Sequence, residues 1–236
     1  MVAIVELRNV TKTYGESEVA VQALAGVDLR LETGAFAAAA GPSGSGKSTL
    51  LNIIGGLDQA TTGDAYLDGE PLAGKTAAQL SRLRMRRVGF IFQSYNLMPV
   101  LTAYENAEYV LMLQGMPAAQ RREKVMAMLE RVGLAGLAHR FPRQLSGGQQ
   151  QRVAIARAIV TEPALVLADE PTANVDSNTA EALLDLMLEL NRERGATFLF
   201  STHDAAVIAK ARQLILLKDG QIVYDGAPAD RPASDG

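Results

Sequence analysis

The segment Gly41–Thr49 has the residue types of a loop that binds phosphate. It matches G-x-x-x-x-G-K-[ST], in which glycines allow backbone N–H groups to turn inward around phosphate oxygens. Lys47 can reach the β- and γ-phosphates of ATP, and the Ser48 hydroxyl can bind Mg²⁺. The alternative is a glycine-rich turn with an incidental lysine, which the flanking elements disfavour. The predicted ATP-binding residues of the loop are Gly41, Pro42, Ser43, Gly44, Ser45, Gly46, Lys47, Ser48 and Thr49.

Two adjacent carboxylates, Asp169 and Glu170, follow the apolar run Ala164–Ala168. A carboxylate at the end of a buried strand is costly unless it meets a cation or hydrogen-bond donors, and a phosphate-bound Mg²⁺ is such a cation. We therefore assign Asp169 to the metal, and Glu170 to the general base that accepts a proton from the attacking water. Taken alone, the pair is better explained as two acids that cap the turn into Pro171, and the phosphate loop reverses that preference.

The elements around these residues alternate as parallel β-α units do. AFAAAA before the loop predicts a buried strand, although alanine favours helices, and residues 48–57 predict a helix. ALVLADE predicts a second buried strand, Asn178–Arg194 predicts a helix that ends at Gly195, and 196–201 predicts a third strand. The fold class is therefore predicted as α/β.

The remaining segments predict smaller elements around this core. Residues 2–40 predict short strands, and 76–87 and 117–131 predict amphipathic helices that flank a middle section of uncertain course. Asp68-Gly69 and Asp219-Gly220 predict hairpin turns.

Composition excludes several classes of protein. At 236 residues, with 48% hydrophobic and 21% charged residues, the chain predicts one α/β domain with a helical insertion. A net charge of −3 gives no basic surface for nucleic acid, so we expect no nucleic-acid partner. The absence of cysteine fits a reducing cytoplasm, and the first residues do not have the pattern of a signal peptide. No segment approaches the apolar length that spans a bilayer, so a membrane role requires a partner.

With LSGGQ at Leu145–Gln149 added, the chain resembles the ATP-binding cassette proteins, the nucleotide-binding subunits of ABC transporters, over nearly its whole length. The family's motifs fall here in their usual order: Tyr14, 41–49, Gln93, 145–149, Asp169-Glu170, Ala173–Asp176 and His203. GGLD at 55–58, VGFIFQSYNLMP at 88–99 and LADEPTANVDS at 167–177 most resemble the subfamily that serves lipoprotein release and macrolide or peptide efflux. Ala173 and Val175 replace the family's commoner glycine and leucine, and Ala37–Ala40 replaces bulkier strand residues.

The resemblance implies a P-loop NTPase of ABC type. Such a fold has a mainly parallel core sheet, an N-terminal antiparallel β subdomain and a helical signature subdomain. We expect one ABC ATPase domain over 1–228, with its helical insertion at about 94–158, and a flexible C-terminal tail over 229–236.

The resemblance also implies a role for each matched residue. Tyr14 would stack on adenine, although a buried strand aromatic is the alternative. Gln93 would contact Mg²⁺ or the attacking water, and alone it would be a surface glutamine. His203 would contact the γ-phosphate and orient Glu170 and the water. His139 receives no role. The catalytic set is thus Glu170, His203, Gln93 and Lys47, and the metal set is Ser48, Gln93 and Asp169.

The signature residues predict a second anion site. Ser146, Gly147 and Gly148 lie where a helix that carries Arg152 and Arg157 begins, so hydroxyl, bare backbone and helix dipole suit an anion. The family implies that Ser146, Gly147, Gly148 and Gln149 clamp the ATP held by the phosphate loop of the other subunit in a head-to-tail homodimer. Asn174 and Asp176 would link the two sites, although helix capping by Asp176 explains part of the same segment.

The implied function is ATP hydrolysis that energises an ABC membrane complex through closure of an ATP-bound dimer. The expected partners are ATP, Mg²⁺ and an integral membrane permease subunit, and the expected location is the cytoplasmic face of the inner membrane. The alternative is a non-transport ATPase that regulates a division or envelope-remodelling complex. The candidate docking surface, which core packing would explain equally well, consists of Phe90, Phe92, Tyr95, Leu97, Met98 and Leu101.

Overall fold

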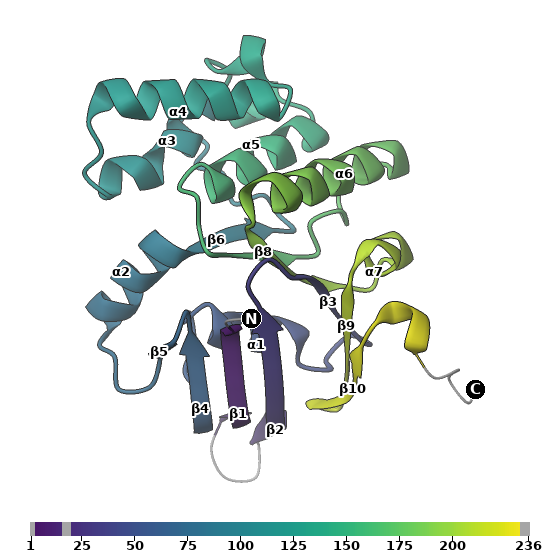
Figure 1. Cartoon of the computed structure of the whole chain (residues 1–236). Helices are drawn as coiled ribbons and strands as arrows, with labels where there is room; N and C mark the ends of the chain where they lie inside the picture. The colour runs from purple at the N-terminus through teal and green to yellow at the C-terminus, as the bar shows by residue number, and fades with distance from the viewer. Residues whose placement is uncertain (1–2, 16–19, 232–236) are drawn as a thin grey trace. The chain divides into compact units, whose positions relative to one another are not determined.

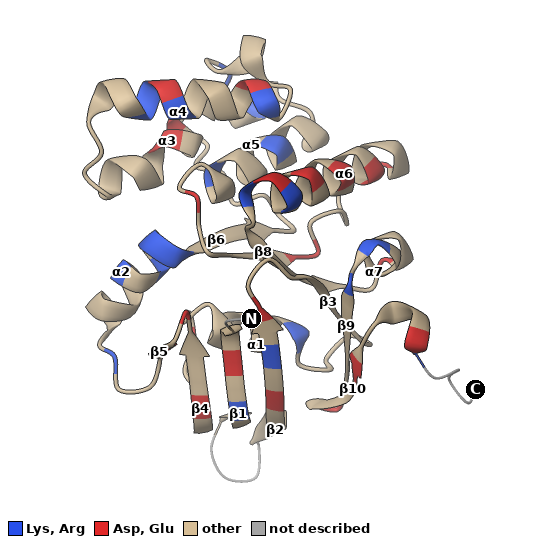
Figure 2. Cartoon of the chain, in the orientation of Figure 1, with Lys and Arg blue, Asp and Glu red and all other residues tan. Residues whose placement is uncertain are grey.

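The computed structural model describes residues 3–15 and 20–231. The chain divides into two compact units. The first unit contains residues 1–81 and 197–236, and the second contains residues 82–196. Helix α2 (Ala77–Arg87) crosses the boundary between them, and its last turn is basic (Figure 2).

An antiparallel sheet forms the N-terminal part of the first unit, with the strand order β2 (Val21–Glu32), β1 (Ala3–Tyr14), β4 (Thr62–Leu67) and β5 (Glu70–Pro71). β1, β2 and β4 lie side by side in Figure 1. β1 and β2 are long strands rather than the short strands expected. The predicted turn at Asp68-Gly69 is confirmed, because both residues have the positive φ angles of a tight hairpin.

Parallel strands form the rest of the first unit. β3 (Phe36–Ala40) pairs in parallel with β8 (Thr197–Thr202) and with β9 (Gln213–Lys218). β10 (Gln221–Gly226) pairs antiparallel with β9. This unit also contains α1 (Lys47–Ile54), α7 (Ala205–Lys210) and the 3₁₀ turn η4 (Pro228–Asp230).

The alanine strand is confirmed, with all five residues of β3 buried. Phe36, Phe198 and Phe200 explain how such small side chains fill a core, because their rings lie 4.7–5.8 Å apart between centroids and supply the missing volume. Ala38 and Ala40 also pack with Leu214 and other buried residues.

The second unit combines a pair of strands with four long helices. β6 (Val88–Phe92) and β7 (Leu165–Asp169) pair in parallel. The helices are α3 (Ala103–Leu113), α4 (Ala118–Arg131), α5 (Gly147–Ile159) and α6 (Ser177–Arg194), with the 3₁₀ turns η2 (Ala135–Leu137) and η3 (Pro142–Gln144) (Figure 1). α6 ends at Gly195, as predicted, and Gly195 has the left-handed conformation.

The structure also describes the candidate docking surface, the length of the helices and part of the C-terminal tail. The docking-surface residues are all half-buried, so their burial favours neither of the two interpretations. Within the described ranges, none of the helices combines the length and apolarity needed to cross a membrane. A tail was expected over 229–236. Its residues from 232 onward lie outside the described residues, and its residues up to Asp230 belong to η4.

Candidate functional site

The phosphate loop connects β3 to α1 along a backbone path that excludes side chains at both ends. Gly41 has a φ of 153°, and a Cβ there would lie 2.2 Å from the carbonyl oxygen of Leu217. Gly46 has a φ of 103°, and its Cβ would lie 2.5 Å from the carbonyl oxygen of Ala23. A Cβ on Gly44 would meet no atom within 4 Å. Both ends of the loop are therefore packed against backbone carbonyl groups of the first unit, and its tip is open.

The loop offers hydrogen-bond donors at its tip and where it joins α1. Among the described hydrogen bonds, none uses the N–H of Gly44 or Gly46, and α1 begins directly after the loop at Lys47. The Lys47 ammonium donates to the carbonyl oxygens of Gly41 (2.8 Å) and Pro42 (2.9 Å). An ammonium carries three donors, so a third remains for an anion. The loop and the positive end of α1 together suit a phosphate group.

Ser45 is the buried residue of the loop. It is only 2% exposed, and within the described chain its hydroxyl has no hydrogen-bond partner. Its carbonyl oxygen accepts a bond from the N–H of Gly220, and the carbonyl oxygen of Gly220 accepts one from the N–H of Ala25. These bonds connect the phosphate loop to the hairpin turn at Asp219-Gly220, which therefore holds the loop in place.

The sheet register places His203 beside the phosphate loop. Ala40 pairs with Thr202 in the parallel strands β3 and β8, and the next residues are Gly41 and His203. Because both strands end at the same edge, the exposed side chain of His203 and the start of the loop lie at one site. This is the placement that a role for His203 at the γ-phosphate requires.

Tyr14 is held by two polar neighbours. Its hydroxyl donates to Asp58 (2.7 Å), and the Lys12 ammonium lies 4.7 Å from the ring centroid and donates to the same carboxylate (2.6 Å). Burial and the Asp58 carboxylate raise the pKa of Tyr14, and the Thr49 side chain lowers it by a smaller amount. The Tyr14 side chain is 41% exposed, which contradicts the alternative of a buried strand aromatic. Nothing in the sequence distinguished Asp58 and Lys12 as its partners.

In the second unit, the register of β6 and β7 places Gln93 beside Glu170. Phe92 pairs with Asp169, so Gln93 and Glu170 follow paired residues and leave the strands at the same edge. Glu170 has a φ of 45°, an unusual angle for a residue with a side chain, and such angles concentrate at functional sites. Asp169 is half-buried at the end of a strand that is otherwise fully buried.

The signature residues form the start of α5. The Ser146 side chain accepts from the N–H of Gln149 (3.3 Å), and the Gln149 side chain accepts from the N–H of Ser146 (2.9 Å). This reciprocal capping box leaves the glycines between them as bare backbone. A Cβ on Gly148 would lie 2.6 Å from Thr179, and one on Gly147 would lie 2.8 Å from the Tyr95 hydroxyl. A Cβ at either position would therefore have to displace a neighbouring side chain of the second unit.

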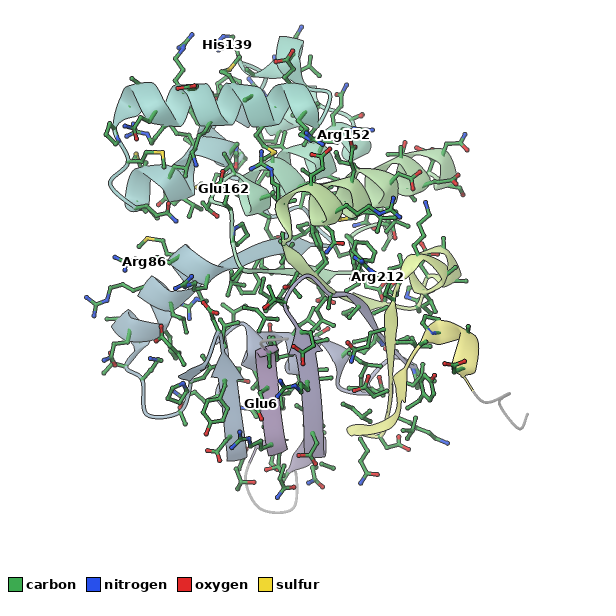
Figure 3. The ribbon with its side chains drawn as sticks, viewed as in Figure 1. Glu6, Arg86, His139, Arg152, Glu162 and Arg212 are labelled. Carbon is green, nitrogen blue, oxygen red and sulfur yellow. The ribbon has the colours of Figure 1, made fainter. Side chains whose placement is uncertain are left out.

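The two arginines of α5 donate to backbone carbonyl oxygens. Arg152, labelled in Figure 3, donates to the carbonyl oxygen of Val132 (2.9 Å). Arg157 donates to the carbonyl oxygens of Asn96 (2.6 Å) and Tyr95 (2.9 Å). Both guanidinium groups therefore hold loops of the second unit. His139, also labelled in Figure 3, is an exposed side chain.

The segment Ala173–Asp176 contains a helix cap and a link to Gln93. Asp176 accepts from the N–H (3.0 Å) and the hydroxyl (2.7 Å) of Thr179, so the capping role is confirmed. These bonds lower the pKa of Asp176. The Asn174 side chain donates to the carbonyl oxygen of Gln93 (2.9 Å). In the described part of the chain, no three His, Asp or Glu side chains form a group that could hold a metal ion.

Comparisons with known proteins point to one family. The family described as ABC transporter matches residues 24–173. The chain is 47% identical to the lipoprotein-releasing system ATP-binding protein LolD 2 of Rhodospirillum rubrum, over 96% of this chain and 98% of that protein. It is 45% identical to an ABC transporter ATP-binding protein of Thermotoga maritima, over 94% of each. It is also 45% identical to the macrolide export ATP-binding/permease protein MacB of Hyphomonas neptunium, but spans only 34% of that longer protein.

Solved structures agree with the sequence comparisons. The dimeric post-hydrolysis structure of the cassette MJ0796, bound to ADP and Pi, superimposes with a TM-score of 0.88 at 42% identity. The superposition covers 97% of this chain and 100% of that one. The structure of cbiO1 from Clostridium perfringens, part of the complex cbiONQ, also gives a TM-score of 0.88, at 27% identity over 97% of this chain and 90% of that chain.

Proposed function

The chain belongs to the ABC transporter family, and from this premise we propose that it energises a membrane complex of the lipoprotein-release or macrolide-efflux type. The predicted fold class is confirmed: the fold is that of an ABC-type P-loop ATPase. The chain is an ATP-binding and ATP-hydrolysing cassette of this family. We also propose that residues 1–228 form a single cassette domain, with a helical insertion at about 94–158.

The observation that carries this proposal is the phosphate loop. Its ends allow no Cβ at Gly41 or Gly46, its tip is open, and the carbonyl oxygens of Gly41 and Pro42 hold the Lys47 ammonium beside the loop. A bare backbone with this concentration of donors suits a polyphosphate better than any neutral ligand.

Hydrolysis would follow from the residues at the two sheet edges. Glu170 accepts a proton from the attacking water, Gln93 beside it orients that water, and His203 beside the phosphate loop contacts the γ-phosphate. Lys47 stabilises negative charge on the transferred phosphate. Tyr14 stacks on adenine. Water attacks the γ-phosphorus in line, the bond to the β-phosphate oxygen breaks, and ADP and phosphate leave.

Mg²⁺ would be held by Ser48, Gln93 and Asp169. These side chains offer a hydroxyl, an amide and one carboxylate, and such oxygen ligands suit Mg²⁺ when phosphate oxygens and water complete the shell. The half-buried position of Asp169 at the end of a buried strand also fits a cation partner. When bound, the ion would neutralise part of the phosphate charge.

ATP would bind between two copies of the chain. Ser146, Gly147, Gly148 and Gln149 would contact the nucleotide held by the partner's phosphate loop, and Asn174 and Asp176 would connect the two sites. A relative at 42% identity forms a dimer with ADP and Pi, which supports this arrangement. Closure around two ATP molecules and reopening after hydrolysis would then drive a permease partner at the cytoplasmic face of the cell membrane.

A pull-down tests the proposed partner. Tagged Glu170→Gln protein, which should bind ATP and hydrolyse it slowly, is incubated with Mg-ATP and detergent-solubilised native membranes, and Lys47→Ala protein is the matched control. We expect a membrane protein with several spans to co-purify with Glu170→Gln and not with Lys47→Ala. Reproducible recovery of only soluble or single-span division factors would contradict the transporter proposal and favour the regulatory alternative.

A further inference from the structure

The loop that follows Gln93 turns sharply through two consecutive left-handed residues. Tyr95 has a φ of 61° and Asn96 a φ of 47°. Asparagine tolerates this region, but a tyrosine there is uncommon, because its Cβ crowds the following carbonyl oxygen. Neighbouring structure must therefore hold the turn in place.

Arg157 on α5 holds this turn. Its guanidinium donates to the carbonyl oxygens of both left-handed residues, at 2.6 Å to Asn96 and 2.9 Å to Tyr95. Burial lowers the pKa of Arg157, but a guanidinium stays charged at neutral pH. A charged group in this position requires acceptors, so the two carbonyl oxygens stabilise the arginine while the arginine stabilises the turn.

Asn106 fixes the other end of the same loop. This residue of α3 is 0% exposed, its side-chain oxygen accepts from the N–H of Met98 (2.8 Å), and its side-chain nitrogen donates to the carbonyl oxygen of Met98 (3.1 Å). With both ends fixed, the direction of the Tyr95 side chain is set by the helices of the second unit.

The Tyr95 side chain reaches two other functional segments. Its hydroxyl donates to the carbonyl oxygen of Asn174 (3.0 Å). The same hydroxyl lies next to Gly147, because a Cβ added to Gly147 would be only 2.8 Å from its oxygen. The Asn174 side chain itself donates to the carbonyl oxygen of Gln93 (2.9 Å). Gln93, Tyr95 and Asn174 therefore form a closed ring of contacts that rests against the first glycine of the signature.

We propose that Tyr95 is a positioning residue that makes the loop after Gln93, the segment 173–176 and the signature glycine Gly147 move as one body. The proposal rests on the proposed function, in which Gln93 orients the water and Gly147 contacts the partner's ATP. A displacement of Gln93 when nucleotide binds is passed through Tyr95 to the surface that meets the second subunit. Small displacements of such contacts change rates strongly, because reacting groups must be closely aligned.

Tyr95→Phe tests this proposal, since it removes one oxygen and keeps the ring. The variant is made in the Glu170→Gln background, and Tyr109→Phe, on the exposed face of α3, is the matched control. ATP binding by the monomer is measured with a fluorescent analogue, and dimerisation is measured by size-exclusion chromatography against Mg-ATP concentration. We expect unchanged monomer binding, and roughly fivefold more ATP needed for half-dimerisation, which corresponds to the loss of one hydrogen bond.

Equal dimerisation of Tyr95→Phe and Tyr109→Phe would overturn the proposal. A parallel loss of monomer ATP binding would overturn it as well, because the effect would then be general damage to the fold. If the Glu170→Gln parent fails to dimerise with ATP, it is the proposed function that fails.

A second measurement tests the contact without nucleotide. Gly147→Ala should lower the unfolding temperature, because its new Cβ meets the Tyr95 oxygen at 2.8 Å, whereas the next atom, the carbonyl oxygen of Asn174, lies at 3.5 Å. Tyr95→Phe removes the first obstacle, so the double variant should recover most of the loss. If the double variant unfolds at the same temperature as Gly147→Ala alone, the placement of Tyr95 against the signature is overturned.

Discussion

The hydroxyl of Tyr14 donates a 2.7 Å hydrogen bond to Asp58, a residue 44 positions further along the chain. The same carboxylate accepts from Lys12, whose ammonium lies over the tyrosine ring. The ring edge is thus fixed and a cation covers part of its surface, while 41% of the side chain stays exposed. This arrangement presents a preoriented aromatic surface on which a base can stack.

Tyr14→Ala should weaken ATP binding without slowing the chemical step. Loss of one base stack should raise the KM for ATP roughly tenfold and leave kcat within about twofold. Tyr66→Ala is the matched control, because Tyr66 also has a cation, Arg8, over its ring at 5.2 Å. Steady-state ATP hydrolysis distinguishes the two, and an equal rise in KM for both variants would contradict the adenine contact.

Asp58 should make the stability of the fold depend on pH in acid. Burial raises the pKa of Asp58, but hydrogen bonds from Lys12, Tyr14 and the N–H of Gln59 outweigh it and lower the pKa below 3.8. The unfolded chain therefore binds this proton more readily, so the stabilisation is complete above pH 3.8 and is lost as the pH falls through the folded-state pKa.

Urea unfolding of Asp58→Asn at several pH values checks this expectation. At pH 7 the variant should be about 1–2 kcal/mol less stable than the wild type, and the difference should shrink below pH 3.8. Asp64→Asn, at an exposed position of β4, serves as the control. A difference that grows toward acid would mean that the carboxylate is not the stabilised form.

Alanine at Gly41 and at Gly44 should have very different effects. Gly41→Ala forces a Cβ to within 2.2 Å of a backbone carbonyl oxygen, so ATP binding should fall by more than about tenfold and the unfolding temperature should drop. Gly44→Ala meets no atom and carries only the strain of its φ of 80°, about 1 kcal/mol. Isothermal titration with ATP and thermal unfolding compare them, and similar losses in both would contradict the described path of the loop.

The residues of the site differ in how far the sequence could predict them. The strand over Ala37–Ala40 was predicted from the loop behind it, against the helical preference of alanine, and β3 confirms it. The course of α3 was not predicted, although its start contains a usable signal, the capping box from Thr102 to Glu105.

Partners far apart in the chain could not be predicted. Tyr95 and Asn174 are separated by 79 residues, and no residue type or spacing near either one indicates their contact. The contacts of Arg152 and Arg157 could not be predicted for the same reason, because their acceptors are backbone carbonyl oxygens of distant loops. Local patterns predict elements and motifs, whereas these contacts depend on how the elements pack.

Hydrolysis and dimerisation of two variants test the central claim most directly. Phosphate release is measured with Mg-ATP for the wild type, Glu170→Gln and Lys47→Ala, and the molecular mass of each is measured with and without ATP. The account predicts that Glu170→Gln binds ATP and dimerises while its turnover falls at least about a hundredfold, and that Lys47→Ala loses binding itself. Wild-type turnover by Glu170→Gln would contradict the assignment of Glu170 as the general base.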